Sequence, residues 1–515
     1  MNSTTPPTTT MQDLKIIQQN INGSLTGQSA LLHQAQDAHI IMLQEPCIKT
    51  DGFTVGTTAW IPVYPANHHS RPNQRVRSLI LVQADIPTDS WESIEIEHSD
   101  ITAITLRCPF GRIRIFNLYV DGQSNLVLVT LKEFLSSSPR NSSHTNCVMD
   151  IVLGDMNRHH PNWDEERNCH LFTNAALLLA HPLLRLIAAQ DWAMALPHGM
   201  PTLEAFGTKN LTCPDNVFCS AEYADRFIIC EARPAERPPH TDHFPIFMTL
   251  DIELQTTQFE PRPDFHKVVW PEYRELLSKN LAQLVDPRRA PTISSIADFD
   301  DRLSALNRAI ADTNTAKVPE SKPSPRSKRW WTPELSEQRK MVLRLGRKAH
   351  RNAWKGDVSS AQAFHDARAA YGKAIAAQKT QHWFEWTTSM TSTSTDIWTA
   401  ARFVGGGSTD GCKTRVPTLV LKDPVSGQTV RKTTNSDKAQ TLRDAFFPPP
   451  ANLSHSPDHS SNTDPAWTFR LPSDIQIQRT FQRLTAGKAT CRGTPPNDLL
   501  RNCADLLAPH IGPLY

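Results

Sequence analysis

Amide, carboxylate and phenol side chains end several apolar segments in the first half of the chain. Asn20 and Asn22 follow one such segment, Glu45 closes the next, and Tyr119 ends a third. The asparagines could mark an ordinary strand-to-turn junction, Glu45 could equally be a surface carboxylate, and Tyr119 could be only a core aromatic. Hydrolysis of a phosphodiester with a metal, however, needs this kind of group: a carboxylate for a hard cation, an activated water and donors to the phosphoryl oxygens.

The segment 151–157 is more specific. An apolar run reaches Gly154, and then Asp155 and Asn157 follow with one residue between them. Both side chains would project near the end of a strand, where open α/β sheets place their active sites. The next loop is polar and aromatic and contains His160 and Trp163. It could contact nucleic acid, or it could be a capped turn.

An Asp-His pair, Asp242-His243, precedes another apolar segment. A lone pair of this kind is usually structural. Here Asp215 lies upstream and could orient the imidazole. Histidine transfers protons or donates to phosphate oxygens near neutral pH, so the three residues are candidates for one catalytic group.

Alternating strands and helices would have to position these residues. Apolar, β-branched segments predict strands at 14–21, 39–43, 79–82, 101–106, 113–119, 148–153, 216–219, 226–230 and 245–250. Helices are predicted at 24–36, 125–135 and 171–190. Many strands with interspersed helices over about 240 residues indicate an α/β domain.

The order of these motifs resembles the endonuclease/exonuclease/phosphatase family, which includes apurinic endonucleases and DNase I. The segment Gln44-Glu45-Pro46 and the run from Gly154 to Trp163 are most similar to the endonucleases of non-LTR (LINE-type) retrotransposons. The resemblance covers about residues 13–250. It implies a four-layer α/β sandwich, with two packed mixed β-sheets flanked by helices, and a Mg²⁺- or Mn²⁺-dependent endonuclease that nicks DNA.

The resemblance also implies a metal site. Glu45 would be the main Mg²⁺ ligand, with Asn22 and Asp242 near the ion or its waters. Apurinic endonucleases carry an acid at the position of Asn22, which implies weaker metal binding here. Thr241 replaces the usual serine before Asp-His, which is a mild change.

The implied catalytic residues surround this site. Asp155 would position or activate the attacking water with support from Asn157, and Asn20 would hold the site and the phosphate. His243 would contact the scissile phosphate, with its tautomer fixed by Asp215. The implied contacts to substrate come from Tyr119 (to the phosphate), Thr202, His160 and Trp163.

The charge of the chain is unevenly distributed. Residues 13–252 contain 17 Lys and Arg against 26 Asp and Glu, a net charge of −9. Residues 321–380 contain 14 against 4, a net charge of +10. Both could be solvated surfaces, but an acidic half that holds a cation beside a basic segment suits a DNA-binding enzyme. RNA is a second partner that the basic region could bind.

The predicted organisation has five parts: a disordered start at 1–12, the endonuclease-like domain at 13–252, a Pro-rich linker at 253–328, a basic helical region at 329–404, and a loop-rich segment at 405–515. The region around 329–335 and the stretch from Gly487 to Leu500 are similar to segments that precede the reverse transcriptase of retroelements. The resemblance therefore implies a truncated reverse transcriptase lead-in, and no polymerase activity is expected.

The ten cysteines contain no Cys-x-x-Cys pair, the N-terminus does not read as a signal peptide, and no apolar stretch approaches the roughly 18 residues of a membrane span. An intracellular protein, nuclear or cytoplasmic and not secreted, is expected, with no membrane and no defined protein partner. Two alternatives to the nuclease stay open: a catalytically inactive retroelement remnant that binds nucleic acid, and a phosphoesterase for another substrate.

Overall fold

A computed structural model describes residues 9–514, apart from 36, 69, 71–73, 139–146, 258–261, 285–292, 294, 322–329, 353–356, 390–415, 417–418, 423–428, 433, 448–470 and 487–493. The chain forms two compact units. The first contains residues 1–258 and 324–448, and the second contains 259–323 and 449–515. Among the described helices, none has a stretch long and apolar enough to cross a membrane.

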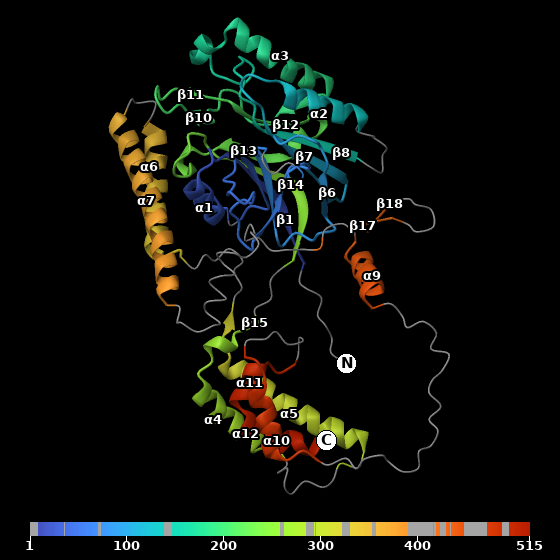
Figure 1. Cartoon of the computed structure of the whole chain (residues 1–515). Coiled ribbons are helices and arrows are strands. Elements are labelled where there is room, and N and C mark those ends of the chain that lie inside the picture. The colour runs from blue at the N-terminus through green and yellow to red at the C-terminus, as the bar shows by residue number, and fades with distance from the viewer. Residues whose placement is uncertain are drawn as a thin grey trace. The chain divides into compact units, whose positions relative to one another are not determined.

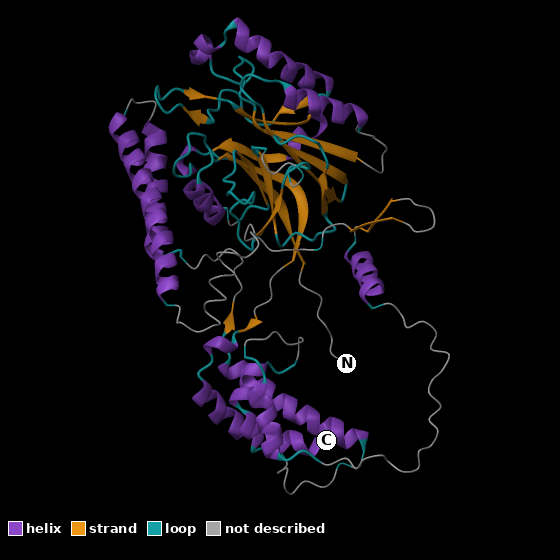
Figure 2. Cartoon of the chain, in the orientation of Figure 1, coloured by secondary structure: helices purple, strands orange, loops and turns teal. Residues whose placement is uncertain are grey.

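Two six-stranded sheets form the centre of the first unit (Figures 1 and 2). The first sheet has the order β13-β14-β1-β2-β4-β3, with strands Phe227–Ala232, Ile246–Thr257, Thr9–Asn20, Ile40–Gln44, Ser78–Gln83 and Trp60–Val63. The second has the order β5-β6-β7-β8-β12-β9, with strands Trp91–Ile94, Ile101–Cys108, Gly111–Tyr119, Cys147–Asp155, Asp215–Ser220 and Trp192–Met194. Both sheets are mixed, because β1 runs parallel to β2 and β7 runs parallel to β8 while the other pairs are antiparallel.

Burial on both faces explains why the central strands are almost continuously apolar. Ile16 and Ile40 belong to a core between the two sheets, whereas the next residues along each strand, Ile17 and Ile41, pack under α1 (Leu25–Gln34). The outer face of the second sheet packs against α2 (Leu126–Ser137) and α3 (Asn174–Ala189). The resulting helix–sheet–sheet–helix arrangement confirms the predicted four-layer α/β sandwich.

The predicted strands and helices of this sandwich are all present, with shifted ends. The first strand begins at Thr9, where residues 9–12 pair with β14, so only residues 1–8 of the predicted disordered start lie outside the described residues. The edge strands β3, β5 and β9 were not predicted. They are only three or four residues long and partly exposed, so their sequences lack a clear apolar pattern.

The basic helical region is a hairpin of two helices, α6 (Pro333–Asn352) and α7 (Val358–Thr388), and it belongs to the first unit. Its apolar side chains form a small core with Ala30 of α1. The same unit contains the short strands β10 (Leu203–Glu204), β11 (Leu211–Thr212), β17 (Leu419–Lys422) and β18 (Thr429–Lys432), and helix α9 (Asn435–Phe446).

The second unit differs from the predicted linker and loop-rich segment. The range 253–328 contains α4 (Trp270–Leu281) and α5 (Ile296–Lys317). These pack with α10 (Asp474–Arg483), α11 (Asn497–Asn502) and α12 (Ala504–Ile511) around a buried apolar core, beside the two-residue strands β15 (Arg262–Pro263) and β16 (Glu320–Ser321). Pro271 lies in the first turn of α4, where proline starts a helix instead of breaking it.

Gly154 allows the close approach of β7 and β8 just before Asp155. Its φ is +138°, and an added Cβ would lie 2.0 Å from the carbonyl oxygen of Leu118. Gly154→Ala is therefore expected to lower the unfolding free energy by about 3 kcal/mol or more. Thermal unfolding of the full chain measures this. Gly207→Ala is the matched control, because no atom lies within 4 Å of its added Cβ. Equal melting temperatures of the two variants would contradict the prediction.

Candidate active site

The candidate residues gather where the ends of the two sheets meet. Asn20 and Gln44, register partners in the first sheet, end β1 and β2. In the second sheet, Asp155 ends β8 opposite both Tyr119 of β7 and Asp215 of β12. Five strands thus bring residues that are far apart in the sequence to one place, and the segment before β14 adds His243.

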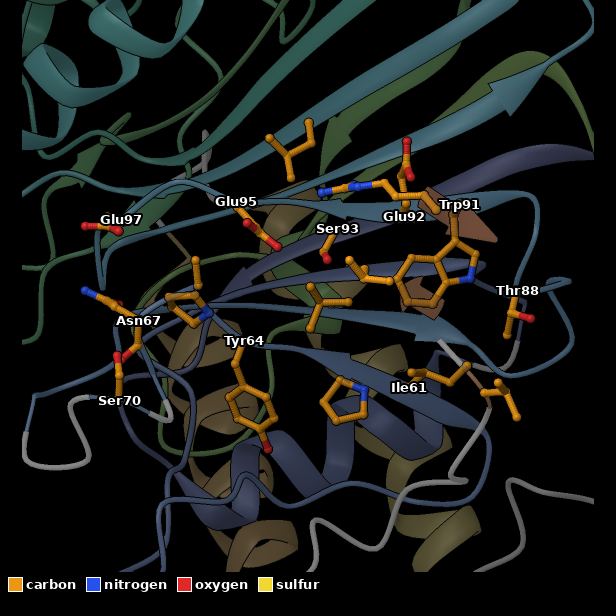
Figure 3. A pocket seen from close by; sticks show the side chains of 18 residues that line it. Ile61, Tyr64, Asn67, Ser70, Thr88, Trp91, Glu92, Ser93, Glu95 and Glu97 are labelled. Carbon is orange, nitrogen blue, oxygen red and sulfur yellow. The ribbon is translucent and has the colours of Figure 1, made fainter. Parts of the chain in front are cut away.

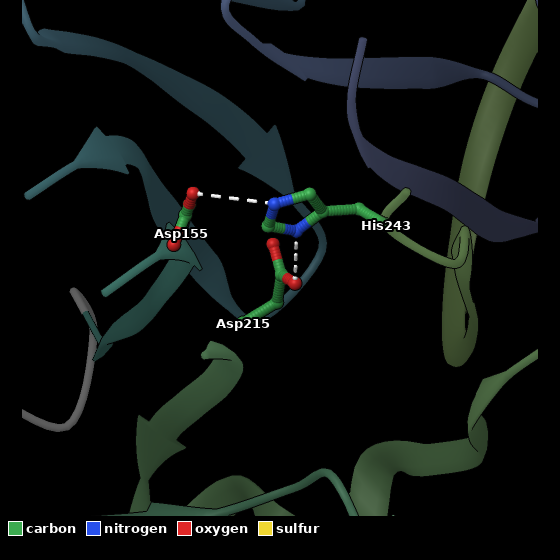
Figure 4. A group of neighbouring side chains, drawn as sticks. All are labelled: Asp155, Asp215 and His243. Atoms are coloured by element: carbon green, nitrogen blue, oxygen red, sulfur yellow. Dashed lines mark hydrogen bonds and ion pairs between the residues drawn. The ribbon is translucent and has the colours of Figure 1, made fainter. Parts of the chain in front are cut away.

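Asp155, Asp215 and His243 form a buried group (Figure 4). His243 Nδ1 lies 2.7 Å from Asp215 Oδ2, and Nε2 lies 3.8 Å from Asp155 Oδ2. With Nδ1–H donated to Asp215, the imidazole has a fixed orientation and presents Nε2 toward Asp155. This is the orienting role that the sequence suggested for Asp215, and it is the arrangement by which a carboxylate sets a histidine tautomer.

Two amide groups hold the Asp155 carboxylate. Asn20 donates from Nδ2 to Oδ2 at 2.9 Å, and the backbone N–H of Asn157 donates to Oδ1 at 3.1 Å. Burial raises the pKa of Asp155 to about 7, although the nearby imidazole of His243 opposes this shift. A carboxylate whose pKa lies near neutrality is suited to take a proton from water.

The pKa of His243 is raised, whereas burial alone would lower the pKa of a histidine. Burial lowers its pKa, but the carboxylates of Asp215 and Asp155 outweigh burial and raise the pKa to about 10. The ring is therefore cationic at neutral pH in this arrangement. A cation at this place would attract a phosphate.

A row of buried amides behind the group was only partly anticipated from the sequence. Gln18 donates from Nε2 to Asp215 Oδ1 at 2.9 Å and to Gln44 Oε1 at 2.6 Å, and Gln44 donates to Asn117. Asn117 in turn donates to the carbonyl groups of Leu43 and Leu79. The sequence does contain a sign of this row, namely glutamine and asparagine residues inside otherwise apolar strands. Buried amides need hydrogen-bond partners, so several of them in neighbouring strands indicate a network.

Glu45 directly follows β2 and is less buried than Asp155. Its side chain is 15% exposed, and its carboxylate pairs with Arg75 at 2.9 Å. The hydroxyl of Tyr119 also hydrogen-bonds Glu45, and burial followed by the charge of Glu45 raises the pKa of Tyr119 well above its usual range. Arg77, which the sequence reasoning missed, stacks 4.6 Å above the Tyr119 ring and pairs with Asp100.

Three predicted site residues have left-handed backbone: Asn22 (φ 51°), Glu45 (φ 44°) and Asn157 (φ 46°). Such conformations are costly outside glycine and concentrate at functional sites. The Asn22 side chain is exposed, and its backbone N–H donates to Asn20 Oδ1. Asp242 is half-buried, its charge helps to raise the pKa of His243, and its carbonyl accepts from the N–H of Glu204.

The structure departs from the sequence for two of the predicted substrate contacts. Trp163 is 2% exposed and packs in the core under α2 and α3, where its indole donates to the carbonyl of Arg158. Thr202 is fully buried, and its hydroxyl accepts the N–H of Asp215. Because both side chains are buried and hydrogen-bonded within the protein, neither is free to contact a substrate. The sequence could not show this, since an aromatic or hydroxyl residue in a polar loop can also anchor the loop to the core. His160 is half-buried.

The oxygen donors fit a hard divalent cation. Asp155, Asp215 and His243 each place a ligand atom within 4.8 Å of the others, so they are a group that could hold a cation. Asp215, however, already accepts from Gln18 and lies within hydrogen-bonding distance of His243. Among the described side chains, Glu45 pairs with the mostly exposed Arg75 and with Tyr119, and Mg²⁺ prefers one or two carboxylates plus water. This favours Glu45 as the protein ligand.

A large hollow of about 850 Å³ lies elsewhere, along the edge strands β3 and β5 (Figure 3). Its lining includes three carboxylates, Glu92, Glu95 and Glu97, against one cation, Arg431, and none of the residues of the buried group. An acidic lining repels phosphate. We therefore place the candidate active site at the strand ends and not in this hollow.

Comparisons with known proteins found no matching family model and no matching curated protein. Among solved structures, the endonuclease domain of TRAS1, a telomere-specific non-LTR retrotransposon, is 16% identical over 46% of this chain and 98% of its own, with a TM-score of 0.37. The AP endonuclease LMAP from Leishmania major is 15% identical over 46% and 88%, with a TM-score of 0.36. An AP endonuclease from Archaeoglobus fulgidus is 17% identical over 46% and 99%, with a TM-score of 0.34.

Proposed function

We propose that the first unit is a divalent-metal-dependent endonuclease that hydrolyses phosphodiester bonds of DNA. The observation that carries this proposal is a buried geometry: the Asp155 carboxylate, held by Asn20 and the backbone of Asn157, lies 3.8 Å from the imidazole of His243, whose other ring nitrogen lies 2.7 Å from Asp215. A carboxylate that can accept a proton and an imidazole that can donate a hydrogen bond to a phosphate oxygen can divide the base and the stabilising roles of hydrolysis between them.

The residues divide the reaction as follows. Asp155, held by Asn20 and Asn157, accepts the proton of the attacking water. As the water oxygen bonds to phosphorus, the bond from phosphorus to the leaving sugar oxygen breaks, and that oxygen takes up a proton from solvent. His243 donates from Nε2 to a non-bridging oxygen of the scissile phosphate, and Asp215 keeps its ring in place. Mg²⁺ or Mn²⁺, held by Glu45 with Asp242 nearby, would stabilise the charge that develops on the phosphate oxygens. Tyr119, whose phenol stays protonated, hydrogen-bonds Glu45 and so positions the proposed metal ligand beside the phosphate.

Nicking of supercoiled plasmid by the full chain tests the proposal. The full chain is required because α6 and α7 share a core with α1, so a fragment ending near residue 255 would expose that core. We expect nicking with Mg²⁺ and none with EDTA. A folded, DNA-binding wild type that never nicks would favour the inactive remnant, and nicking that survives EDTA would overturn the metal assignment.

Glu45→Gln keeps the size of the side chain and removes its charge. Because Glu45 is the proposed metal ligand, we expect this variant to need at least about tenfold more Mg²⁺ for half-maximal nicking. A titration of nicking rate against Mg²⁺ concentration measures the change. Glu222→Gln, an exposed residue of the same unit, is the control and should match wild type. Equal Mg²⁺ dependence of the two variants would remove Glu45 from the metal site.

A retroelement origin is also part of the proposal, and it rests on the motifs from Gln44 to Pro46 and from Gly154 to Trp163. Within the reverse transcriptase lead-in suggested by the sequence, residues 487–493 lie outside the described residues. Asn497–Asn502 form α11 of the second unit. RNA as an additional ligand of the basic region remains a prediction.

A further inference from the structure

The α6–α7 hairpin is fixed to the segment that carries the catalytic histidine. Arg368 of α7 donates to the carbonyl oxygens of Thr241 at 3.0 Å and Pro238 at 3.4 Å. Glu204 of β10 pairs with Arg237 of the same segment at 2.6 Å, and His365 of α7 lies 3.3 Å from Glu204. The hairpin and β10 therefore both contact the residues that lead into His243.

Two glycines inside these helices permit the contact. A Cβ added to Gly346 of α6 would lie 2.8 Å from Ala235 Cα, and one added to Gly372 of α7 would lie 2.8 Å from His240 Nε2. Glycine inside a helix costs about 1 kcal/mol relative to alanine, so its presence at both contact points needs a packing reason. Close docking against residues 234–240 supplies that reason, and Lys379 adds a hydrogen bond to Ser29 of α1.

Helix α6 has two distinct faces. Leu335, Val342 and Gly346 are buried at a spacing that places them on one side. The opposite side presents five exposed basic residues in a stripe that we call the basic ridge: Lys340, Arg344, Arg347, Lys348 and Arg351. Within the described part of the chain, only Lys340 of these five has a carboxylate partner, Glu337 at 2.7 Å.

We propose that the basic ridge is a binding surface for the phosphate backbone of double-stranded DNA, mounted on the nuclease unit beside its catalytic histidine segment. This rests on the proposed function and adds the part of the chain that holds the substrate. The ridge spans about 16 Å along the helix, which matches about five base pairs of a duplex. It supplies positive charge that residues 13–252, with a net charge of −9, lack.

The chemistry of the ridge favours a polyanion with regularly spaced charges. Among the described residues of α6, one large apolar side chain is exposed, Met341, and it lies at the edge of the ridge and not among the five cations, which is too little apolar surface for insertion into a lipid surface. Arginine, present three times, pairs with phosphate through two parallel N–H donors. Binding through such contacts releases counterions and weakens steeply with salt.

The test compares two triple variants of the full chain that lose the same charge. Arg344→Gln with Arg347→Gln and Arg351→Gln removes three ridge cations. Arg112→Gln with Lys132→Gln and Arg185→Gln removes three exposed cations from β7, α2 and α3. Fluorescence anisotropy with a 20-base-pair duplex, in EDTA so that nothing is cut, gives Kd at several salt concentrations.

We expect the ridge variant to bind at least about tenfold more weakly at 0.1 M salt, with a salt dependence shallower by about 2.7 in the log–log slope, while the control set stays near wild type. Equal weakening by both sets, or none by the ridge set, overturns the proposal, as does a loss confined to an RNA duplex of the same length. Because binding is measured without cleavage, a wild type that does not nick leaves the ridge result standing and refutes only the nuclease.

Discussion

Asp155→Asn in the full chain is expected to lower the rate of Mg²⁺-dependent plasmid nicking by about 10²–10⁴-fold, the usual contribution of a positioned proton acceptor. Asparagine keeps the shape of the side chain and can still accept one of the two hydrogen bonds that Asn20 and Asn157 donate. It cannot accept a proton from water. Single-turnover nicking at saturating Mg²⁺ measures the chemical step without interference from product release.

Asp155→Asn should also become more stable than wild type as the pH rises. The pKa of Asp155 is about 7 in the folded protein, above the usual value of 3.8, so ionisation of this carboxyl disfavours the folded state. That penalty is absent at pH values below about 4 and grows as pH rises to about 7. We therefore expect the melting temperature of Asp155→Asn, relative to wild type, to increase between pH 4 and pH 8.

Asp251→Asn is the control, because Asp251 is an exposed carboxylate of β14 whose side chain is 66% exposed. It should match wild type in both nicking and melting. If Asp155→Asn nicked DNA at the wild-type rate, Asp155 would not be the proton acceptor. If its melting temperature fell at every pH, the carboxylate would be a structural anchor rather than a strained functional group.

The α/β sandwich could be predicted from the sequence because its central strands are buried on both faces. Such strands are continuous apolar runs, and the polar residue that ends each one marks the edge of the sheet. This is why Asn20, Glu45 and Asp155 could be chosen as a set. The order of the motifs added what the individual residues could not, since each alone suits an ordinary turn.

Other features could not be read because they depend on contacts between distant residues. The docking of Gly372 against His240 joins positions about 130 residues apart, and a helical glycine carries no sign of its partner. Trp163 was expected to face nucleic acid, but the same residue type serves as a core anchor when its loop folds inward. Prolines and charges suggested a linker at 253–328, whereas amphipathic helices with long polar faces also have that composition.

Asp215→Asn and His243→Gln are each expected to lower the nicking rate by about 10²–10³-fold, and the double variant should be no slower than the slower single variant. The reason is that the proposed role of Asp215 in the reaction is to hold the ring of His243, whose Nδ1 lies 2.7 Å from its carboxylate. Residues that work as one unit show such non-additivity. A double-mutant cycle on single-turnover rates measures it, and losses that multiply would show that Asp215 has a separate role.

The pKa of His243 distinguishes an electrostatic role of Asp215 from a loss of packing, because a loss of packing alone would not remove a charge beside the imidazole. Its pKa is raised to about 10 against the lowering effect of burial, with Asp215 contributing the strongest raising influence. Removing that charge in Asp215→Asn should lower the pKa of His243, which NMR titration of its ring protons can follow. An unchanged pKa would mean that Asp155 and Asp242 sustain the cation without Asp215. A lowered pKa together with lost nicking would tie the charge of the imidazole to phosphate hydrolysis, because a neutral ring loses the attraction that a cation exerts on the scissile phosphate.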